Sequence, residues 1–174
     1  VSACVLTMTA CGDKKEAAST SSSEKTVASS TTATTSSSEK KEYRTVGAKS
    51  DKALNTLVKN STGKDIKAVA IKEEDKTDYP ASMLNEKDQI KNSETVDLFY
   101  TPENADQQKK YAVQVTFADD SVKEISTMDF ADVDAASEVE LKLDSDVVFL
   151  KYKNKKGETI ETKETELAAK KKKE

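Results

Sequence analysis

Apolar and polar side chains alternate with a period of two residues along the second half of the chain. In residues 111–117 the odd positions are large and apolar, whereas the even positions are small or polar. Successive side chains of a β-strand point to opposite faces, so this pattern predicts a strand with one buried face. Residues 95–100 and 138–143 alternate in the same way and predict two further strands.

Shorter apolar runs extend the series of predicted strands. We expect strands at 54–59, 65–72, 122–126 and 147–153, and a weaker one at 159–162. The connections Asn60–Gly63, Ala118–Ser121 and Asn154–Gly157 have the lengths and residue types of tight turns. The sequence therefore predicts seven or eight short strands, with no long helical pattern between them.

This arrangement of short strands and tight turns indicates the fold class. Alternating strands with one polar face are typical of antiparallel sheets that pack on each other. The prediction is an all-β protein, an antiparallel β-sandwich with an immunoglobulin-like arrangement of its strands.

One long segment, Glu73–Ser93, interrupts the strand pattern. Loops of more than about 15 residues are unusual in a compact domain and tend to carry a function or local structure of their own. The apolar side chains of Met83, Leu84 and Ile90 favour a segment that closes an open end of the sandwich. The alternative is a binding loop.

The first twelve residues have a different character. Residues 1–10 carry no charge, and the sequence Leu6-Thr7-Met8-Thr9-Ala10-Cys11-Gly12 leads directly into charged residues. This stretch resembles the lipobox of bacterial lipoproteins. The resemblance implies that a signal peptide is removed before Cys11 and that the Cys11 thiol carries diacylglycerol. Residues 1–10 would then be the C-terminal part of a signal peptide. The protein would be held on the extracellular face of the cell membrane. Because the mature domain has no cysteines for disulfide bonds, we expect a Gram-positive envelope.

A tract of Ser and Thr follows Cys11. Fifteen of the twenty residues from Ser19 to Ser38 are Ser or Thr. Such side chains bury too little apolar surface to offset the entropy of folding, so residues 11–42 are predicted to be a disordered linker. A flexible chain of about 30 residues has a root-mean-square reach of roughly 30 Å. The predicted organisation is thus a signal peptide (1–10), the linker (11–42), the sandwich domain (43–162) and a Lys-rich tail (163–174) that includes a possible short helix.

A second resemblance concerns the domain itself. The order Asn60-x-x-Gly63-x-x-Ile66, Met83-Leu84, Glu94-x-Val96-x-Leu98 and Tyr111-x-Val113-x-Val115 is similar to a small β-sandwich module found in bacterial secreted proteins and lipoproteins. The similarity extends over residues 52–130. It implies a sandwich fold and no particular chemistry.

The composition favours a protein without enzymatic activity. The sequence contains no His, and its two cysteines are Cys4, in the predicted signal peptide, and Cys11. The predicted mature domain therefore lacks the usual general base of a nucleophilic triad and the ligands of a soft transition-metal site. We expect no cofactor. The formal net charge of −4 argues against binding to nucleic acid.

The best candidates for a metal site are Asp129, Asp132 and Asp134. Carboxylates at close spacing on a loop can bind calcium, but the run lacks the glycine of an EF-hand loop. A solvated loop is the preferred interpretation, and no metal site is predicted.

Together these features predict a cell-surface lipoprotein with a non-enzymatic binding or interaction domain. Its partners would be the membrane, through the lipid, and a protein or cell-wall component of unknown identity. The alternatives are a structural lipoprotein of the cell envelope and a calcium-dependent binding module.

Overall fold

The computed structural model describes residues 41–103 and 109–172 of the 174-residue chain. The predicted signal peptide, Cys11 and the Ser/Thr tract lie outside the described residues. What the structure describes is thus the predicted sandwich domain and most of the predicted tail.

The described residues form nine strands and one helix. Their bounds are β1 Arg44–Val46, β2 Leu54–Ser61, β3 Ile66–Glu73, β4 Thr95–Tyr100, β5 Tyr111–Phe117, β6 Val122–Met128, β7 Glu138–Asp144, β8 Val147–Lys153, β9 Thr159–Glu161 and α1 Lys163–Lys171. Each predicted strand is present, within one or two residues of the expected bounds. The three-residue strand β1 was not expected, because so short a segment shows no alternation.

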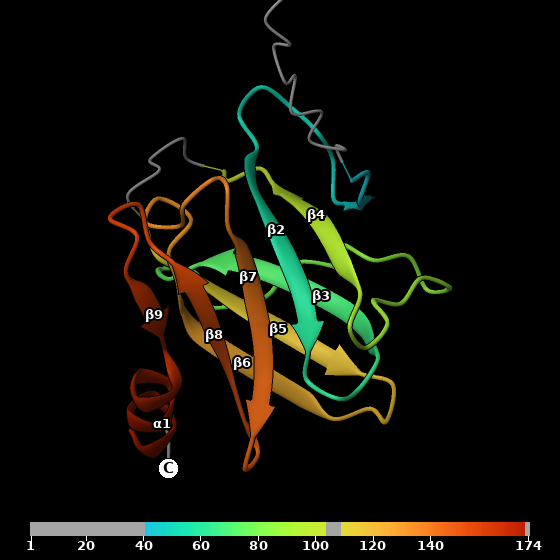
Figure 1. Ribbon diagram of the computed structural model, residues 1–174. Coiled ribbons are helices and arrows are strands. Elements are labelled where there is room, and N and C mark those ends of the chain that lie inside the picture. The colour runs from blue at the N-terminus through green and yellow to red at the C-terminus, as the bar shows by residue number, and fades with distance from the viewer. Residues whose placement is uncertain (1–40, 104–108, 173–174) are drawn as a thin grey trace, which may run out of the picture. The chain divides into compact units, whose positions relative to one another are not determined.

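The strands form two sheets that pack on each other (Figure 1). One sheet has six strands in the order β1-β4-β2-β7-β8-β9, and the other has three in the order β3-β5-β6. Most neighbouring strands are antiparallel, and β5–β6 and β8–β9 are the hairpins that the turns predicted. The predicted all-β sandwich is confirmed.

Two neighbouring pairs in the larger sheet are parallel, which the sequence did not indicate. They are β1 with β4 and β2 with β7. Parallel neighbours require a long connection between them. Here the connection from β1 to β4 includes β3 of the smaller sheet, and the connection from β2 to β7 includes all three strands of that sheet. The short Asn60–Gly63 turn, with Gly63 at φ +82°, accordingly leads from one sheet to the other.

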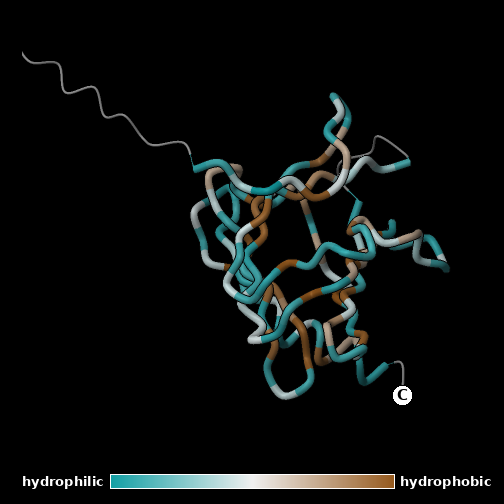
Figure 2. Tube along the Cα trace, turned by 90° about the vertical axis from the view of Figure 1, so that its right-hand side faces the viewer, coloured by the Kyte–Doolittle hydropathy of each residue, from teal (hydrophilic) through white to brown (hydrophobic). Residues whose placement is uncertain are grey.

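The core lies between the two sheets. Hydrophobic and hydrophilic stretches are interspersed along the chain in Figure 2, and the buried apolar side chains form one cluster. Its most deeply buried members include Ile66, Ile71, Val96, Tyr111, Val115, Phe117, Ile125, Val139 and Val148. Burial of these apolar side chains is the main source of stability for a domain of this kind.

Helix α1 belongs to this domain. It contacts β8 and β6, although the sequence placed residues 163–174 in a tail beyond the sandwich. Within the described parts of the chain, no helix combines the length and apolar character needed to span a membrane.

Candidate functional site

The predicted metal candidates lie in the connection between β6 and β7, where they stabilise turns. The Asp129 carboxylate accepts a hydrogen bond from the Ala131 N–H at 2.9 Å, and the Asp134 carboxylate accepts one from the Ala136 N–H at 3.0 Å. Asp132 raises the pKa of Tyr152, after the larger effect of burial of that phenol. In the described segments of the chain, no three acidic, His or Cys side chains converge to hold a metal ion.

The segment Glu73–Ser93 covers the free edge of β3. Leu84 and Ile90 are buried in the core, and Met83 packs against it. The Met83 N–H donates to the Val69 carbonyl at 2.7 Å, and Ile90 exchanges two backbone hydrogen bonds with Ile66. This packing matches the expectation that the segment closes the sandwich.

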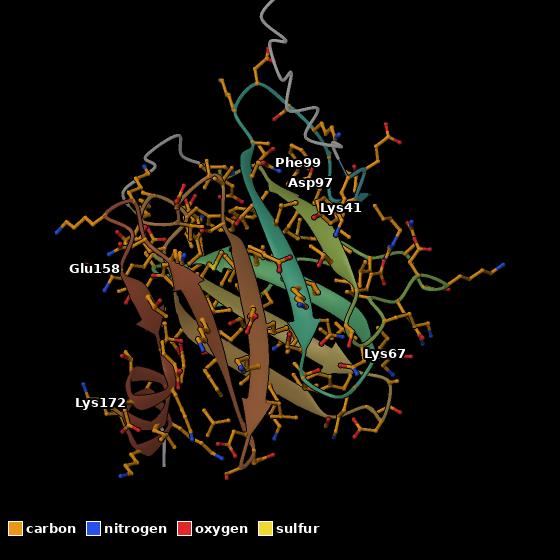
Figure 3. The ribbon with its side chains drawn as sticks, viewed as in Figure 1. Lys41, Lys67, Asp97, Phe99, Glu158 and Lys172 are labelled. Atoms are coloured by element: carbon orange, nitrogen blue, oxygen red, sulfur yellow. The ribbon has the colours of Figure 1, made fainter. Side chains whose placement is uncertain are left out.

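The outer face of β4 carries an aromatic ring among polar groups. Asp97 and Phe99 lie near each other on this strand (Figure 3). The Asn55 side-chain amide donates to the Asp97 carboxylate, and the Lys49 ammonium lies 5.0 Å from the centroid of the Phe99 ring. The hydrogen bond joins the neighbouring strands β2 and β4, and the contact of Lys49 with Phe99 holds the 47–53 connection against the sheet.

One buried acid, Glu73, is the last residue of β3, and its partner Lys109 lies just before β5. Glu73 is 1% exposed, and its carboxylate forms an ion pair with the Lys109 ammonium at 3.0 Å. The ion pair raises the pKa of Lys109. Because removing either partner of a buried ion pair leaves a costly charge, this pair serves to fix Lys109 against β3.

A hollow lies between β6 and α1. It has a volume of about 230 Å³ and is lined by residues of β6, of β8 and its preceding turn, and of α1. Its apolar lining residues include Val122, Val147 and Val148. Charged lining residues include Lys123, Asp146 and Lys170. We refer to this hollow as the β6–α1 groove.

A buried glutamate joins the two walls of the groove. Glu166 of α1 is 4% exposed. Its carboxylate accepts a hydrogen bond from the Ser126 N–H at 2.9 Å and another from the Thr127 hydroxyl. Since both donors belong to β6, a side chain of the helix takes the place of a neighbouring strand at this point of the sheet edge.

Ion pairs hold the opposite end of the groove. The turn between β7 and β8 places Asp146 at φ +70°. Its carboxylate pairs with Lys123 of β6 and, at 3.2 Å, with Lys170 of α1. The hydrogen bond from Lys123 is the largest cause of the lowered pKa of Asp146. This acid therefore stays ionised and links three elements.

Tyr79 connects the Glu73–Ser93 segment with β6. Burial raises the pKa of its phenol, and the nearby Glu124 carboxylate raises it further. The Lys72 ammonium lies 4.5 Å from the centroid of its ring. The segment that the sequence singled out thus brings a phenol near Glu124, a residue of the strand that lines the groove.

The sequence did not single out Glu166 or Asp146. Both lie in ordinary charged stretches, and their importance comes from partners distant along the chain. The presence of a charged residue every third or fourth position in 163–171 signals only a helix with a solvated face.

Comparison with known proteins gives little further information. No protein-family model matches the chain, and no curated protein matches it. Among solved structures it is similar to a protein from Eubacterium rectale whose structure was determined by NMR. The two share 15% sequence identity with a TM-score of 0.36, and the match covers 59% of this chain and 90% of the other.

Proposed function

We propose that this chain is a bacterial lipoprotein, held by a lipid on Cys11 at the outer face of the cell membrane, with a non-enzymatic binding domain. The observation that carries the proposal is the order of segments in the sequence. An uncharged apolar run ends at Cys11, a Ser/Thr tract follows, and the first strand of the compact domain begins at Arg44. This order fits a folded domain held away from a membrane.

The composition of the domain supports binding rather than catalysis. The sequence has no His and no Cys after Cys11. The domain therefore lacks the most common general base and any thiol nucleophile. A Gram-positive envelope is the setting that we propose for it.

We place the binding surface of the domain at the β6–α1 groove. The groove is lined by both apolar and charged side chains, as binding sites commonly are. One of its walls is the edge strand of a sheet. A sheet edge binds extended polypeptides through main-chain hydrogen bonds, so the ligand class that fits is an extended segment of a protein.

The lipid anchor is tested by expressing the protein in a Gram-positive host behind a complete signal peptide. We expect the wild-type chain to begin at Cys11, to carry a diacylglycerol-sized mass increment and to enter the detergent phase on partitioning. The variant Cys11→Ala should lose all three properties, whereas the control Cys4→Ala should keep them, because Cys4 lies before the cleavage point. An unmodified wild-type chain that retains residues 1–10 would overturn the proposal.

A further inference from the structure

The hydrogen-bond pattern of the β5–β6 hairpin fixes which backbone groups of β6 face outward. The Phe117 N–H donates to the Ser121 carbonyl at 2.9 Å. Because inward and outward residues alternate in an antiparallel pair, Lys123 and Ile125 direct their backbone groups toward β5. Val122, Glu124 and Ser126 then direct theirs away from β5, and the bond from the Ser126 N–H to Glu166 agrees with this assignment.

The other sheet edges are short or covered. The edge strands of the six-stranded sheet, β1 and β9, have three residues each. The β3 edge is covered by the Glu73–Ser93 segment, as described above. The β6 edge has seven residues, and the groove lies beside its first half. Long edges tend to pair with other strands unless something blocks them.

An exposed apolar side chain marks the same edge. Val122 is 52% exposed. Among the residues that the structure describes, it is the exposed large hydrophobic side chain. It lines the groove at the start of β6.

Helix α1 is short, and its position beside β6 depends on tertiary contacts. It has nine residues, and short helices are marginal without tertiary contacts. The residue before it, Thr162, does not cap it with its side chain, because the Thr162 hydroxyl oxygen accepts a hydrogen bond from the Leu150 N–H at 3.0 Å. The polar ties of α1 to the sandwich are Glu166 and the ion pairs Lys163–Asp144 and Lys170–Asp146.

The sequence of β6 is compatible with pairing to itself. In an antiparallel pair of two copies centred on Ile125, Glu124 lies opposite Ser126 of the second copy, and Lys123 lies opposite Thr127. The backbone groups of Glu124, which face away from β5, then exchange hydrogen bonds with those of Ser126 in the second copy. No two like charges lie directly opposite each other in this register, whereas registers centred on Lys123 or Glu124 place like charges together.

We infer that α1 is a displaceable cover of the β6 edge, and that the partner of the uncovered edge is a second copy of this chain, bound by antiparallel β6–β6 pairing. The two three-stranded sheets would then become one continuous sheet. Glu166 controls this pairing, because its carboxylate accepts the hydrogen bond from the Ser126 N–H. The second copy needs the same N–H for its own backbone hydrogen bond. This inference rests on the binding surface proposed above, at the β6–α1 groove, and not on the lipid anchor. The anchor and the pairing of β6 can therefore fail separately, because the lipid on Cys11 and the association of the unlipidated protein are measured in different experiments.

The test compares association of the unlipidated protein and its variants by sedimentation equilibrium over a wide range of concentration. We expect the wild type to be monomeric, and Glu166→Ala to dimerise with a dissociation constant about tenfold or more below that of the matched control Glu164→Ala. Glu164 is exposed on the same helix, so its loss leaves Ser126 capped. A chain ending at Thr162 should dimerise more tightly still.

A second substitution tests whether the contact is β6. Glu124→Pro removes an outward N–H without removing a hydrogen bond to β5. Added to Glu166→Ala, it should restore the monomer. The inference is overturned if Glu166→Ala has a native circular dichroism spectrum and remains as monomeric as Glu164→Ala. A dimer that persists with Glu124→Pro overturns it equally. If the chain ending at Thr162 does not fold, the comparison of full-length Glu166→Ala with full-length Glu164→Ala tests the inference.

Discussion

A single glycine, Gly47, controls how the chain enters the sandwich. It follows β1 at φ +86°, and a Cβ at this position would lie 2.0 Å from the Phe99 carbonyl oxygen and 2.7 Å from the Met83 side chain. Only glycine allows the parallel neighbour β4 to approach so closely. Gly157, at φ +82°, has no atom within 4 Å of such a Cβ.

These two glycines therefore predict unequal costs for the same substitution. Gly47→Ala should lower the free energy of unfolding by about 3 kcal/mol or more, because it adds a backbone clash to the strain of a positive φ. Gly157→Ala should cost about 1 kcal/mol, from the backbone conformation alone. Urea denaturation measures both. Equal losses would show that the Gly47 clash is relieved by a small backbone shift.

At the scale of elements, the shortest strand is firmly attached to the domain. Val46 of β1 is 2% exposed. The Arg44 guanidinium donates to the Glu94 carboxylate at 2.8 Å and to the Gln89 carbonyl at 2.7 Å. In the proposed function, β1 is where the linker meets the sandwich, so these contacts would bear any pull from the membrane.

The attachment of β1 predicts a contrast between two valines on edge strands. Val46→Ala should lower the free energy of unfolding by about 2 kcal/mol, because it leaves a cavity in the core. The same change at Val122, which is largely exposed, should alter it by less than about 0.5 kcal/mol. Thermal or urea unfolding of the two variants decides. A negligible effect at Val46 would mean that β1 is not part of the cooperative unit.

At the scale of the whole molecule, buried phenols connect stability to pH. Burial is the main cause that raises the pKa of Tyr100 to about 12 and that of Tyr152 to about 12, from an ordinary value of 10.0. Below pH 10 these phenols are protonated in both the folded and the unfolded chain. Above it the unfolded chain loses its protons first, so the native state is progressively disfavoured as the pH rises from 10 to 12.

The domain should therefore lose stability between pH 10 and pH 12. The urea midpoint at a series of pH values measures the loss, and phenolate absorbance reports the titration itself. The double variant Tyr100→Phe/Tyr152→Phe should show a shallower decline over the same range, because these two groups no longer titrate. If the stability of the double variant falls as steeply as that of the wild type, other groups, such as the paired lysines, cause the loss of stability at alkaline pH.

The sequence by itself determined the strands, two hairpins and the sandwich class. These depend on local patterns: alternation at 111–117 and 138–143 follows directly from the geometry of a half-buried strand, and short turns leave adjacent strands little choice of partner. The lipid on Cys11 is also a sequence prediction, and it lies outside the residues that the structure describes.

Only the tertiary structure decided which distant segments meet. The parallel neighbours β1–β4 and β2–β7 follow from how the two sheets close on each other, for which no local pattern exists. Glu166 is an ordinary helix residue until the fold brings it to Ser126, which precedes it by 40 residues. Local periodicity reports whether a side chain faces the core, whereas the partner of a polar group depends on the path of the whole chain.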